Sequence, residues 1–286
     1  MNVSVVIPVL NEEELIEQCL IAIINNSEKP LEIILVDGGS TDKTLEIAKK
    51  YNQVTIVEDK GGTAASSRNK GIKLAKGEII AFTDGDCIVT NNWISEINNS
   101  FINNNIGGLG GSVIPAKPRN KIEEYWGNLS LNVIMHFGDD MYVVEKRSLN
   151  DAFITANCAY LKTVLELNGG FDPWFGNNAE DIEISWRLLN NGVKLMYIPS
   201  VKALAHSVVT ISGIKHKSFR DGVSSSKLQK KYGGKLNYDL KLYKLLVKNI
   251  IGMIKQEENA RLNVIEIIWH LFGKYYGSFK VHVINV

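Results

Sequence analysis

The first 83 residues alternate short apolar runs with amphipathic stretches, and this alternation constrains the fold more than any other feature of the chain. Apolar runs bounded by turn residues are typical of strands, and apolar residues three or four positions apart are typical of helices. We expect strands at residues 3–9, 31–36, 53–58 and 78–83, and helices at residues 12–25, 43–51 and 64–75. Such a series forms right-handed crossovers, so the chain is predicted to be an α/β protein with a mainly parallel, Rossmann-like sheet flanked by helices. Ligands of these sheets bind at the carboxyl ends of the strands.

The pattern is looser after residue 84. Residues 115–150 mix aromatic and charged side chains without a clear period, and we interpret them as an excursion from the sheet. Elsewhere the periodicity and the turn residues predict a helix at 92–103, a strand at 109–114, an ordered segment at 153–159, a helix at 180–190 and strands at 194–198 and 201–206. The sheet domain is therefore expected to cover residues 1–206.

Residues 207–286 are predicted to be a helical C-terminal extension, with helices near 215–232, 238–256 and 261–280. These segments carry basic residues beside Leu, Ile, Trp and Tyr. That pattern fits helices docked on the protein core and also helices that rest on a bilayer surface. Docking on the core is the preferred interpretation, with peripheral membrane contact as the alternative. The extension contains no uninterrupted apolar stretch of the length that spans a membrane.

Charge and cysteine content exclude several classes of protein. The chain has 32 basic and 31 acidic residues for a net charge of +1, so general attraction to nucleic acid is not expected. The three cysteines, Cys19, Cys87 and Cys158, lack the spacing of a metal site and favour a reducing compartment. The chain begins with a strand pattern rather than a signal peptide. We therefore expect a cytoplasmic protein, with the inner face of the cell membrane as the place of any peripheral contact.

Asp84-Gly85-Asp86 follows the apolar run Ile79–Phe82 and carries the strongest chemical signal. Two carboxylates at the end of a buried strand supply hard oxygen ligands, which suit Mg²⁺ or Mn²⁺ together with a diphosphate. Gly85 lets the backbone approach a ligand closely and leaves room for the metal. Taken alone, the triplet also fits an ordinary turn, because Asp and Gly are favoured turn residues.

Six motifs occur in a fixed order along the chain. They are Val5–Glu12, Val36–Asp42, Ser67–Gly71, Asp84–Asp86, Gly169–Asp172 and Glu180–Asp181. Together they resemble family 2 of the nucleotide-sugar glycosyltransferases, and the resemblance covers residues 1–206. It implies the GT-A fold, a metal-dependent site and, usually, an inverting mechanism.

The resemblance assigns a donor pocket to residues at the ends of the first strands. The backbone around Pro8 and Val9 and the side chains of Glu12 and Asp37 are expected to hold the base and ribose, because carboxylates there can accept hydrogen bonds from ribose hydroxyls. Arg68 is expected near the nucleotide, where its guanidinium binds phosphate or stacks on a base. The alternatives are a turn or helix-capping role for Asp37 and a surface salt bridge for Arg68.

The resemblance also assigns the metal site. Asp86 is expected to coordinate the cation, and Asp84 to hydrogen-bond ribose or a metal-bound water. His206 resembles a third ligand that follows the last core strand in related enzymes, and a structural role for this histidine is the alternative. The cation would neutralise the leaving diphosphate.

Glu180 and Asp181 open the predicted helix at 180–190. Asp181 matches the base that removes the proton from the acceptor hydroxyl in inverting transfer, and Glu180 supports it or binds a sugar hydroxyl. If the acceptor is a phosphate, Asp181 orients it instead. A helix-capping role for the acidic pair is the structural alternative. Trp174 is expected either to stack on a sugar ring or to pack within its turn.

These assignments predict a metal-dependent, inverting glycosyltransferase that moves a sugar from a UDP- or GDP-sugar donor to a hydroxyl acceptor. The acceptor would be a carbohydrate or a lipid-linked molecule in the synthesis of cell-surface polysaccharide, glycolipid or glycoprotein glycans. A polyprenyl-phosphate glycosyltransferase is the nearest alternative. From other classes we considered a nucleotidyltransferase, whose basic glycine-rich phosphate loop is absent after the first strand, and a non-catalytic scaffold that binds sugar nucleotides.

Overall fold

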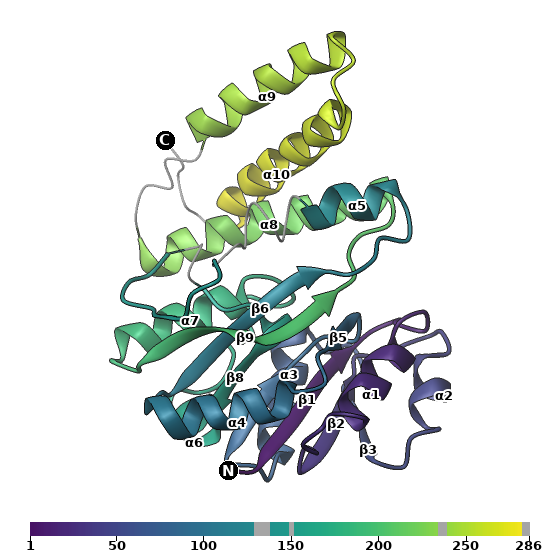
Figure 1. The fold of residues 1–286 in the computed structure, drawn as a ribbon. Helices are drawn as coiled ribbons and strands as arrows, with labels where there is room; N and C mark the ends of the chain where they lie inside the picture. Colours follow the sequence, from purple (N-terminus) through teal and green to yellow (C-terminus); the bar gives the residue numbers. More distant parts are fainter. Residues whose placement is uncertain (129–137, 149–151, 234–238, 282–286) are drawn as a thin grey trace. The chain divides into compact units, whose positions relative to one another are not determined.

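The chain divides into two compact units (Figure 1). The computed structural model describes residues 1–128, 138–148, 152–233 and 239–281. The first unit contains residues 1–117 and 128–207, and the second unit contains residues 118–127 and 208–286. The sequence-based division after residue 206 lies one residue from the structural boundary. Of the predicted excursion at 115–150, residues 129–137 and 149–150 lie outside the described part of the chain.

Residues 118–127 join the second unit, although the sequence analysis placed them in the sheet domain. The Tyr125 hydroxyl donates a hydrogen bond to Oδ1 of Asn263 at 2.6 Å. The Asn120 side-chain amide donates to the carbonyl of Val209 at 3.0 Å. These contacts with residues far along the chain explain the difference, because no local pattern in the sequence records them.

The alternating pattern of the first 83 residues forms the parallel half of the sheet. Its strands are β1 (Val3–Val9), β2 (Glu32–Asp37), β3 (Val54–Glu58) and β4 (Ile79–Phe82), joined by α1 (Ile16–Ile24), α2 (Thr44–Ala48) and α3 (Ala64–Leu74). Their order is β3-β2-β1-β4, and all three pairings are parallel. The predicted strands are confirmed. Helix α1 begins four residues later than expected, because Glu12 lies in a turn in which its carbonyl accepts from the amides of Leu15 and Ile16.

The rest of the sheet is mixed. It contains β5 (Cys87–Val89), β6 (Gly108–Pro115), β7 (Tyr142–Val143), β8 (Cys158–Leu161) and β9 (Leu195–Ala205), with α4 (Trp93–Asn104), the short 3₁₀ helix η2 (Thr155–Asn157), α6 (Lys162–Leu167) and α7 (Glu180–Asn190). Within the described residues the sheet has nine strands, in the order β3-β2-β1-β4-β8-β6-β9-β5 with β7 paired to β9. The first half of the sheet is parallel, as predicted, and β6 and β9 are also parallel, but β8 is antiparallel to both of its neighbours, so the sheet as a whole is mixed.

The two strands predicted at 194–198 and 201–206 form the single strand β9. Its pairing with β6 shifts register between Gly111 and Ser112, where Ile198 and then Lys202 are the partners on β9. Pro199 lies in this irregular stretch. Proline has no amide hydrogen to donate to the ladder, so a local bulge accommodates it without ending the strand.

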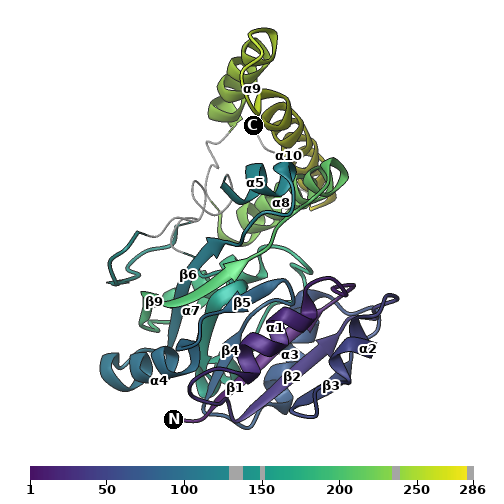
Figure 2. The same ribbon diagram turned by 45° about the vertical axis from the view of Figure 1, so that its right-hand side comes forward.

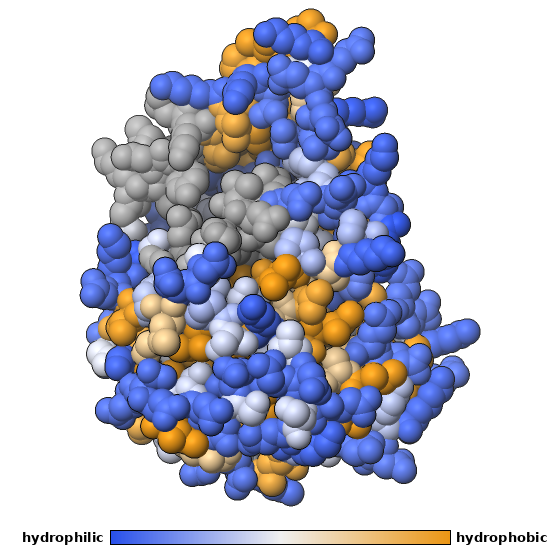
Figure 3. Space-filling model, viewed as in Figure 1, coloured by the Kyte–Doolittle hydropathy of each residue, from blue (hydrophilic) through white to orange (hydrophobic). Residues whose placement is uncertain are grey.

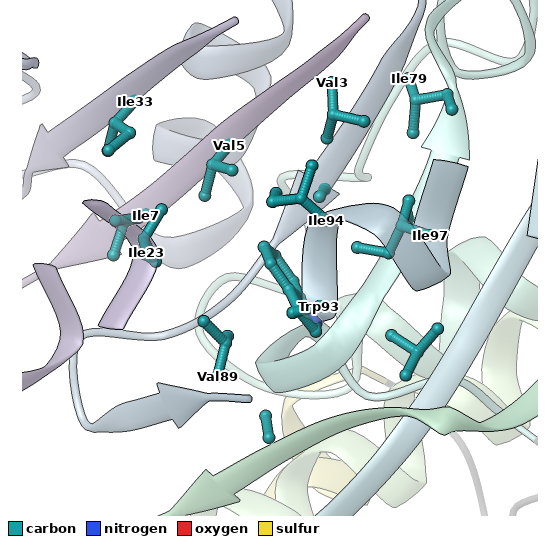
Figure 4. Close-up of a cluster of buried hydrophobic side chains, with 14 of the residues drawn as sticks. Val3, Val5, Ile7, Ile23, Ile33, Ile79, Val89, Trp93, Ile94 and Ile97 are labelled. Atoms are coloured by element: carbon teal, nitrogen blue, oxygen red, sulfur yellow. The ribbon is translucent and has the colours of Figure 1, made fainter. Parts of the chain in front are cut away.

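Helices cover both faces of the sheet (Figure 2), because successive residues of a buried strand point to opposite sides. On β1, Val5 and Ile7 pack with α1 and α4, whereas Val6 packs with α3 on the other face. Figure 4 shows the first of these clusters around the fully buried Trp93. The indole Nε1 of Trp93 donates to Asn157 at 2.8 Å, which satisfies its only polar group.

The second unit consists of helices, as the sequence predicts for the C-terminal part. They are α5 (Lys121–Gly127), α8 (Ile211–Tyr232), α9 (Asp239–Ile254) and α10 (Ala260–Lys280). Helices α8 and α10 approach closely through glycines: a Cβ at Gly273 would lie 2.0 Å from the Phe219 carbonyl oxygen, and one at Gly222 would lie 2.1 Å from that of His270. Among the described helices, none combines the length and the apolar character needed to cross a bilayer.

Candidate active site

The strand order defines where a ligand can bind. Strands β2 and β3 lie on one side of β1 and β4 lies on the other, so the order in which strands are added to the sheet reverses at β1. In open α/β sheets, ligands occupy the carboxyl ends of the strands at such a switch point. Pro8 and Val9 end β1, Glu12 follows it, and the loop Asp84–Asp86 follows β4. The switch point thus collects residues from two of the predicted motifs.

Gly85 brings these two strand ends into contact. A Cβ at this position would lie 3.0 Å from Cγ1 of Val9 and 3.1 Å from Cγ of Glu12. The need for glycine was predicted from a metal and a ligand, but the structure adds a nearer cause, which is the crowding by Val9 and Glu12. Pro8 is half-buried beside them and Val9 is buried.

Asp37 ends β2, opposite Val9 in the parallel register. Its buried carboxylate accepts hydrogen bonds from the backbone amides of Gly39 and Ser40, each at 3.1 Å. The side chain therefore organises the loop after β2, as a turn aspartate does. A carboxylate can accept about four hydrogen bonds, so this role leaves acceptor capacity for a ligand.

Hydrogen bonds join the loops that follow β1 and β2. The Thr41 amide donates to Oδ1 of Asn11 at 2.8 Å, and the Glu12 amide donates to the Thr44 hydroxyl at 2.8 Å. Asn11 has a φ of 57°, in the left-handed region that asparagine tolerates better than most residues. The sequence analysis missed this role of Asn11 and Thr44. The sequence signal that could have indicated this role is that Asn11 directly precedes Glu12, which was predicted to bind the donor nucleotide.

Arg68, on α3, lies at the centre of the acidic residues. Its NH2 donates to Oδ1 of Asp84 at 2.8 Å, and its NH1 donates to Oε1 of Glu180 at 2.6 Å. The ring of Phe171 lies 5.7 Å from the guanidinium carbon. Arg68 is 3% exposed and Glu180 is 4% exposed, whereas the side chain of Asp84 is 34% exposed.

This geometry adds a structural role to the one expected for Arg68. Both terminal nitrogens are engaged by carboxylates, so the residue connects the loop after β4 to the start of α7, and its contact with the nucleotide stays a prediction. The alternative of a surface salt bridge is wrong, because the ion pair with Glu180 is buried. Among the described residues, Nε of Arg68 and Oε2 of Glu180 have no hydrogen-bond partner.

Asp86 and His206 lie next to each other, one residue beyond the paired ends of β5 and β9. Cys87 of β5 pairs with Ala205 of β9, and the next residues outward are Asp86 and His206, with the His206 amide donating to the Asp86 carbonyl at 3.0 Å. Directly opposed residues of antiparallel strands point to the same face, with Cβ atoms about 4.5–5.5 Å apart. The structure therefore juxtaposes the two predicted metal ligands, which are 120 positions apart in the sequence. Within the described residues, however, no group of three His, Cys, Asp or Glu side chains is arranged to hold a metal.

Helix α7 begins at Glu180, as predicted, and presents Asp181 in its first turn. Ala179 precedes it with a φ of 64°, a left-handed conformation that is costly for alanine and is often found at functional sites. Oδ1 of Asp181 accepts a hydrogen bond from the Ile182 amide at 2.8 Å, while Ala179 at the N-cap position has no side-chain capping hydrogen bond.

The pKa of Asp181 is raised to about 7, chiefly because burial disfavours its charged form and secondarily because Glu180 adds negative charge. The Ile182 amide and the Arg68 guanidinium oppose this increase. A carboxyl group with a pKa near neutrality is a more effective proton acceptor than an ordinary aspartate, because it binds the proton more strongly while still ionising at pH 7.

The loop that carries Phe171 is held by Asn69 of α3, which lies in the motif Ser67–Gly71. The Asn69 side chain donates to the Phe171 carbonyl at 2.7 Å and accepts from the Phe171 amide at 2.8 Å. Gly170 has a φ of 65°, and a Cβ there would lie 2.4 Å from Oδ1 of Asn69. The Gly-Gly-Phe motif is thus a tight turn against α3 that places an aromatic ring beside Arg68. Trp174, further along, is 42% exposed and packs edge-on against Phe175.

Solved structures share this architecture. A mannosyltransferase, PcManGT from Pyrobaculum calidifontis in complex with GDP-Man and Mn²⁺, superposes with a TM-score of 0.64 at 17% identity over 98% of this chain and 87% of its own. S. aureus TarS residues 1–349 in complex with UDP gives a TM-score of 0.58 at 15% identity over 99% of this chain and 92% of that chain. The class of protein is therefore one with the GT-A fold of glycosyltransferases, as the sequence predicts.

The sequence comparison is more specific. Residues 4–165 match the model of the family described as glycosyl transferase family 2, and the chain belongs to that family. Glycosyltransferase AglE from Haloferax volcanii is 36% identical over 118 residues, which cover 39% of this chain and 39% of that relative. The similarity therefore spans well under half of the relative's length.

Proposed function

We propose that this protein is an inverting, metal-dependent glycosyltransferase that transfers a sugar from a UDP- or GDP-sugar to an acceptor hydroxyl. One observation carries the proposal: a single buried arginine holds Asp84 of the β4 loop and Glu180 of α7, next to Asp181 with its raised pKa. Donor-side and acceptor-side carboxylates thereby meet at the switch point of a family 2 fold.

Asp181 is assigned as the catalytic base. In the proposed step the acceptor oxygen forms a bond to the anomeric carbon while the bond from that carbon to the diphosphate oxygen breaks. The proton of the acceptor hydroxyl goes to Asp181, and the electron pair of the broken bond leaves with the nucleotide diphosphate. The raised pKa supports a hydroxyl acceptor over a polyprenyl phosphate, since a phosphate oxygen attacks without losing a proton.

Glu180 is assigned to bind a sugar or acceptor hydroxyl. One of its oxygens is held by Arg68, and the other is buried without a partner among the described residues. A buried acceptor atom of this kind is costly unless something donates to it, and a hydroxyl of the substrate is the donor that the reaction provides.

Asp86 and His206 would hold the cation. A carboxylate oxygen and an imidazole nitrogen on one face of the β5–β9 pair fit Mn²⁺ well, and Mg²⁺ would rely on Asp86 and water. When bound, the cation supplies positive charge against the leaving diphosphate. Asp84, half-exposed and oriented by Arg68, would hydrogen-bond ribose or a water on the metal.

The donor nucleotide is assigned to the ends of β1 and β2. The backbone at Pro8 and Val9, the Glu12 side chain and the remaining acceptor capacity of Asp37 would face base and ribose. The GDP-Man and UDP complexes of the two structural neighbours support either nucleotide, so the base is left open. The three cysteines are free and buried, which fits the reducing cytoplasm.

The test is a donor screen with purified protein. UDP-glucose, UDP-GlcNAc, UDP-galactose and GDP-mannose are each incubated with Mn²⁺, Mg²⁺ or a chelator, and released nucleotide diphosphate is measured. We expect metal-dependent release from one donor, and a loss of about a thousandfold in Asp86→Asn, because a metal ion supplies several kcal/mol of charge stabilisation. Donor binding without release by any donor, with or without candidate acceptors, would favour the non-catalytic scaffold. Release that is independent of metal and unchanged in Asp86→Asn would overturn the metal assignment.

A further inference from the structure

Helices α9 and α10 of the second unit expose large apolar side chains in continuous stripes. On α9, Val247, Ile250 and Ile254 are 57%, 44% and 80% exposed, at spacings of three and four residues that place them on one side of the helix. On α10, Phe272 and Phe279 are 56% and 86% exposed, seven positions apart. Isolated exposed apolar residues are common, but stripes of this kind mark a surface that binds something.

The two stripes meet. The hydroxyl of Tyr243, one turn before Val247 on α9, is hydrogen-bonded to the hydroxyl of Tyr275, which lies between Phe272 and Phe279 on α10. The stripes therefore belong to one surface of the second unit, which we call the α9–α10 face. Figure 3 shows apolar and charged side chains interleaved over α9.

The second unit buries Ile214, Leu228, Ile267 and Leu271, but small residues line part of its α8–α10 contact. Gly222, Gly273 and Gly277 lie where α8 and α10 pack, and the buried hydroxyls of Ser226 and Ser278 are hydrogen-bonded at 3.0 Å. In water, large apolar side chains provide the main driving force for helix packing, and they are expected inside. Small residues where two helices meet, with further large apolar residues left on the outside, are also found in helices that contact lipid.

The distribution of charge along the chain indicates what kind of partner the α9–α10 face would bind. Residues 208–286 contain 14 Lys and Arg against 5 Asp and Glu, a net of +9, whereas residues 1–207 contain 18 against 26, a net of −8. The overall charge of +1 conceals this division. On α10, Nζ of Lys280 lies 5.6 Å from the ring of Tyr276, and Nζ of Lys215 on α8 lies 5.7 Å from the ring of Trp269. Basic groups beside aromatic rings are the arrangement found at the headgroup level of membranes.

We propose that the α9–α10 face binds the surface of an anionic lipid bilayer, with both helices lying in the plane of the interface. The exposed stripes would enter the boundary between headgroups and acyl chains, and the lysines would contact lipid phosphates. Because none of the described helices meets the requirements for a membrane span, the interaction is peripheral. A second copy of the chain is a poorer occupant, since two units of net charge +9 repel each other.

The test is flotation of the full-length protein with lipid vesicles. We expect binding to phosphatidylcholine vesicles that contain phosphatidylglycerol, weak binding to phosphatidylcholine alone, and loss of the difference at high salt. The double variant Phe272→Asn, Phe279→Asn should bind anionic vesicles at least about tenfold more weakly, because it removes two rings from the buried area. Lys244 and Lys248 are exposed on α9, three positions before Val247 and one position after it. The double variant Lys244→Glu, Lys248→Glu should lose about fivefold or more in binding for each lysine.

Leu167→Asn is the matched control. Leu167 is 86% exposed, as is Phe279, but it belongs to the first unit, so its substitution should leave flotation unchanged. All the altered side chains are exposed, and circular dichroism checks that each variant is folded. Absence of flotation, or binding that ignores lipid charge and both double variants, would overturn the proposal. So would a dimer, seen by sedimentation, that the phenylalanine variant dissociates while vesicles are not bound. None of these results depends on transferase activity.

Discussion

The two units differ in how their closest helix contacts and their exposed surfaces are built. In the first unit, Phe82, Trp93 and Phe171 are fully buried between the sheet and its helices, and the Trp93 indole has a hydrogen-bond partner. In the second unit, glycine and serine line the α8–α10 contact while Phe272 and Phe279 face outward. The first unit buries several of its large aromatic side chains within its own core. The second unit buries Trp126 and Leu271 but leaves Phe272 and Phe279 exposed, and the burial of these two rings requires a partner.

The largest expected effect on stability tests how far the first unit depends on its buried charges. Arg68→Ala leaves Glu180 buried without a counter-ion, and breaking such a pair costs about 3–5 kcal/mol. Urea unfolding should show this loss. Restoring much of the stability in the double variant Arg68→Ala, Glu180→Gln would confirm that the unpaired charge is the cause. If Arg68→Ala unfolds like the unaltered protein, the buried ion pair does not hold the site.

Asp181→Asn should lower turnover about a hundredfold or more while leaving donor binding unchanged, because it removes the proton acceptor alone. In the unaltered protein, turnover should rise with pH through about 7 as Asp181 ionises, and the variant should lack this limb. The pH profile of kcat/KM and the affinity for nucleotide are the measurements. A fully active Asp181→Asn protein would refute the base assignment.

Ionisation of Asp181, which should raise turnover, should lower the stability of the folded protein. Since the pKa of Asp181 is raised in the folded state from 3.8 to about 7, the folded state binds more protons than the unfolded state between these values. Stability from this group is therefore lost as the pH rises from about 4 to 7. Asp181→Asn should unfold at a higher denaturant concentration than the unaltered protein at pH 8, and the gain should vanish at pH 4.

The smallest effects sharpen the contrast between the units. Gly273→Ala adds one methyl group where a Cβ would lie 2.0 Å from the Phe219 carbonyl oxygen, so we expect a loss of about 1–3 kcal/mol. Phe279→Ala removes a whole ring from an exposed position and should change stability by less than about 0.5 kcal/mol. Hydrogen exchange of α8 and α10 measures both locally, with β1 and α3 as internal references. A reversed order would show that the second unit is packed like the first.

Much of the donor side could be predicted from the sequence, because its signals are local. The strands and helices up to Phe82 follow from periodicity, and the carboxyl ends of parallel strands must meet at one edge. Strand β5, three residues long, is too short to carry a pattern. The insertion of β8 between β4 and β6 depends on pairing with distant residues, which no single segment records.

The role of Arg68 was out of reach for the same reason. Its partners Asp84 and Glu180 are 16 and 112 positions away, and only the fold brings them together. The sequence placed all three residues at the site but could not say which touched which. The glycines and phenylalanines of α10 were likewise visible, but the sequence does not show which of them face the neighbouring helix.

Because Arg68 pairs with both Asp84 and Glu180, substitutions in the loop after β4 and at the start of α7 should depend on each other during evolution. If Arg68 were replaced by an uncharged residue during evolution, the loop after β4 and the start of α7 would both carry unpaired negative charge. Family members that lack the arginine should therefore also have an uncharged residue at the position equivalent to Glu180. Designers who graft a new donor loop onto this scaffold would have to carry the beginning of α7 along with it.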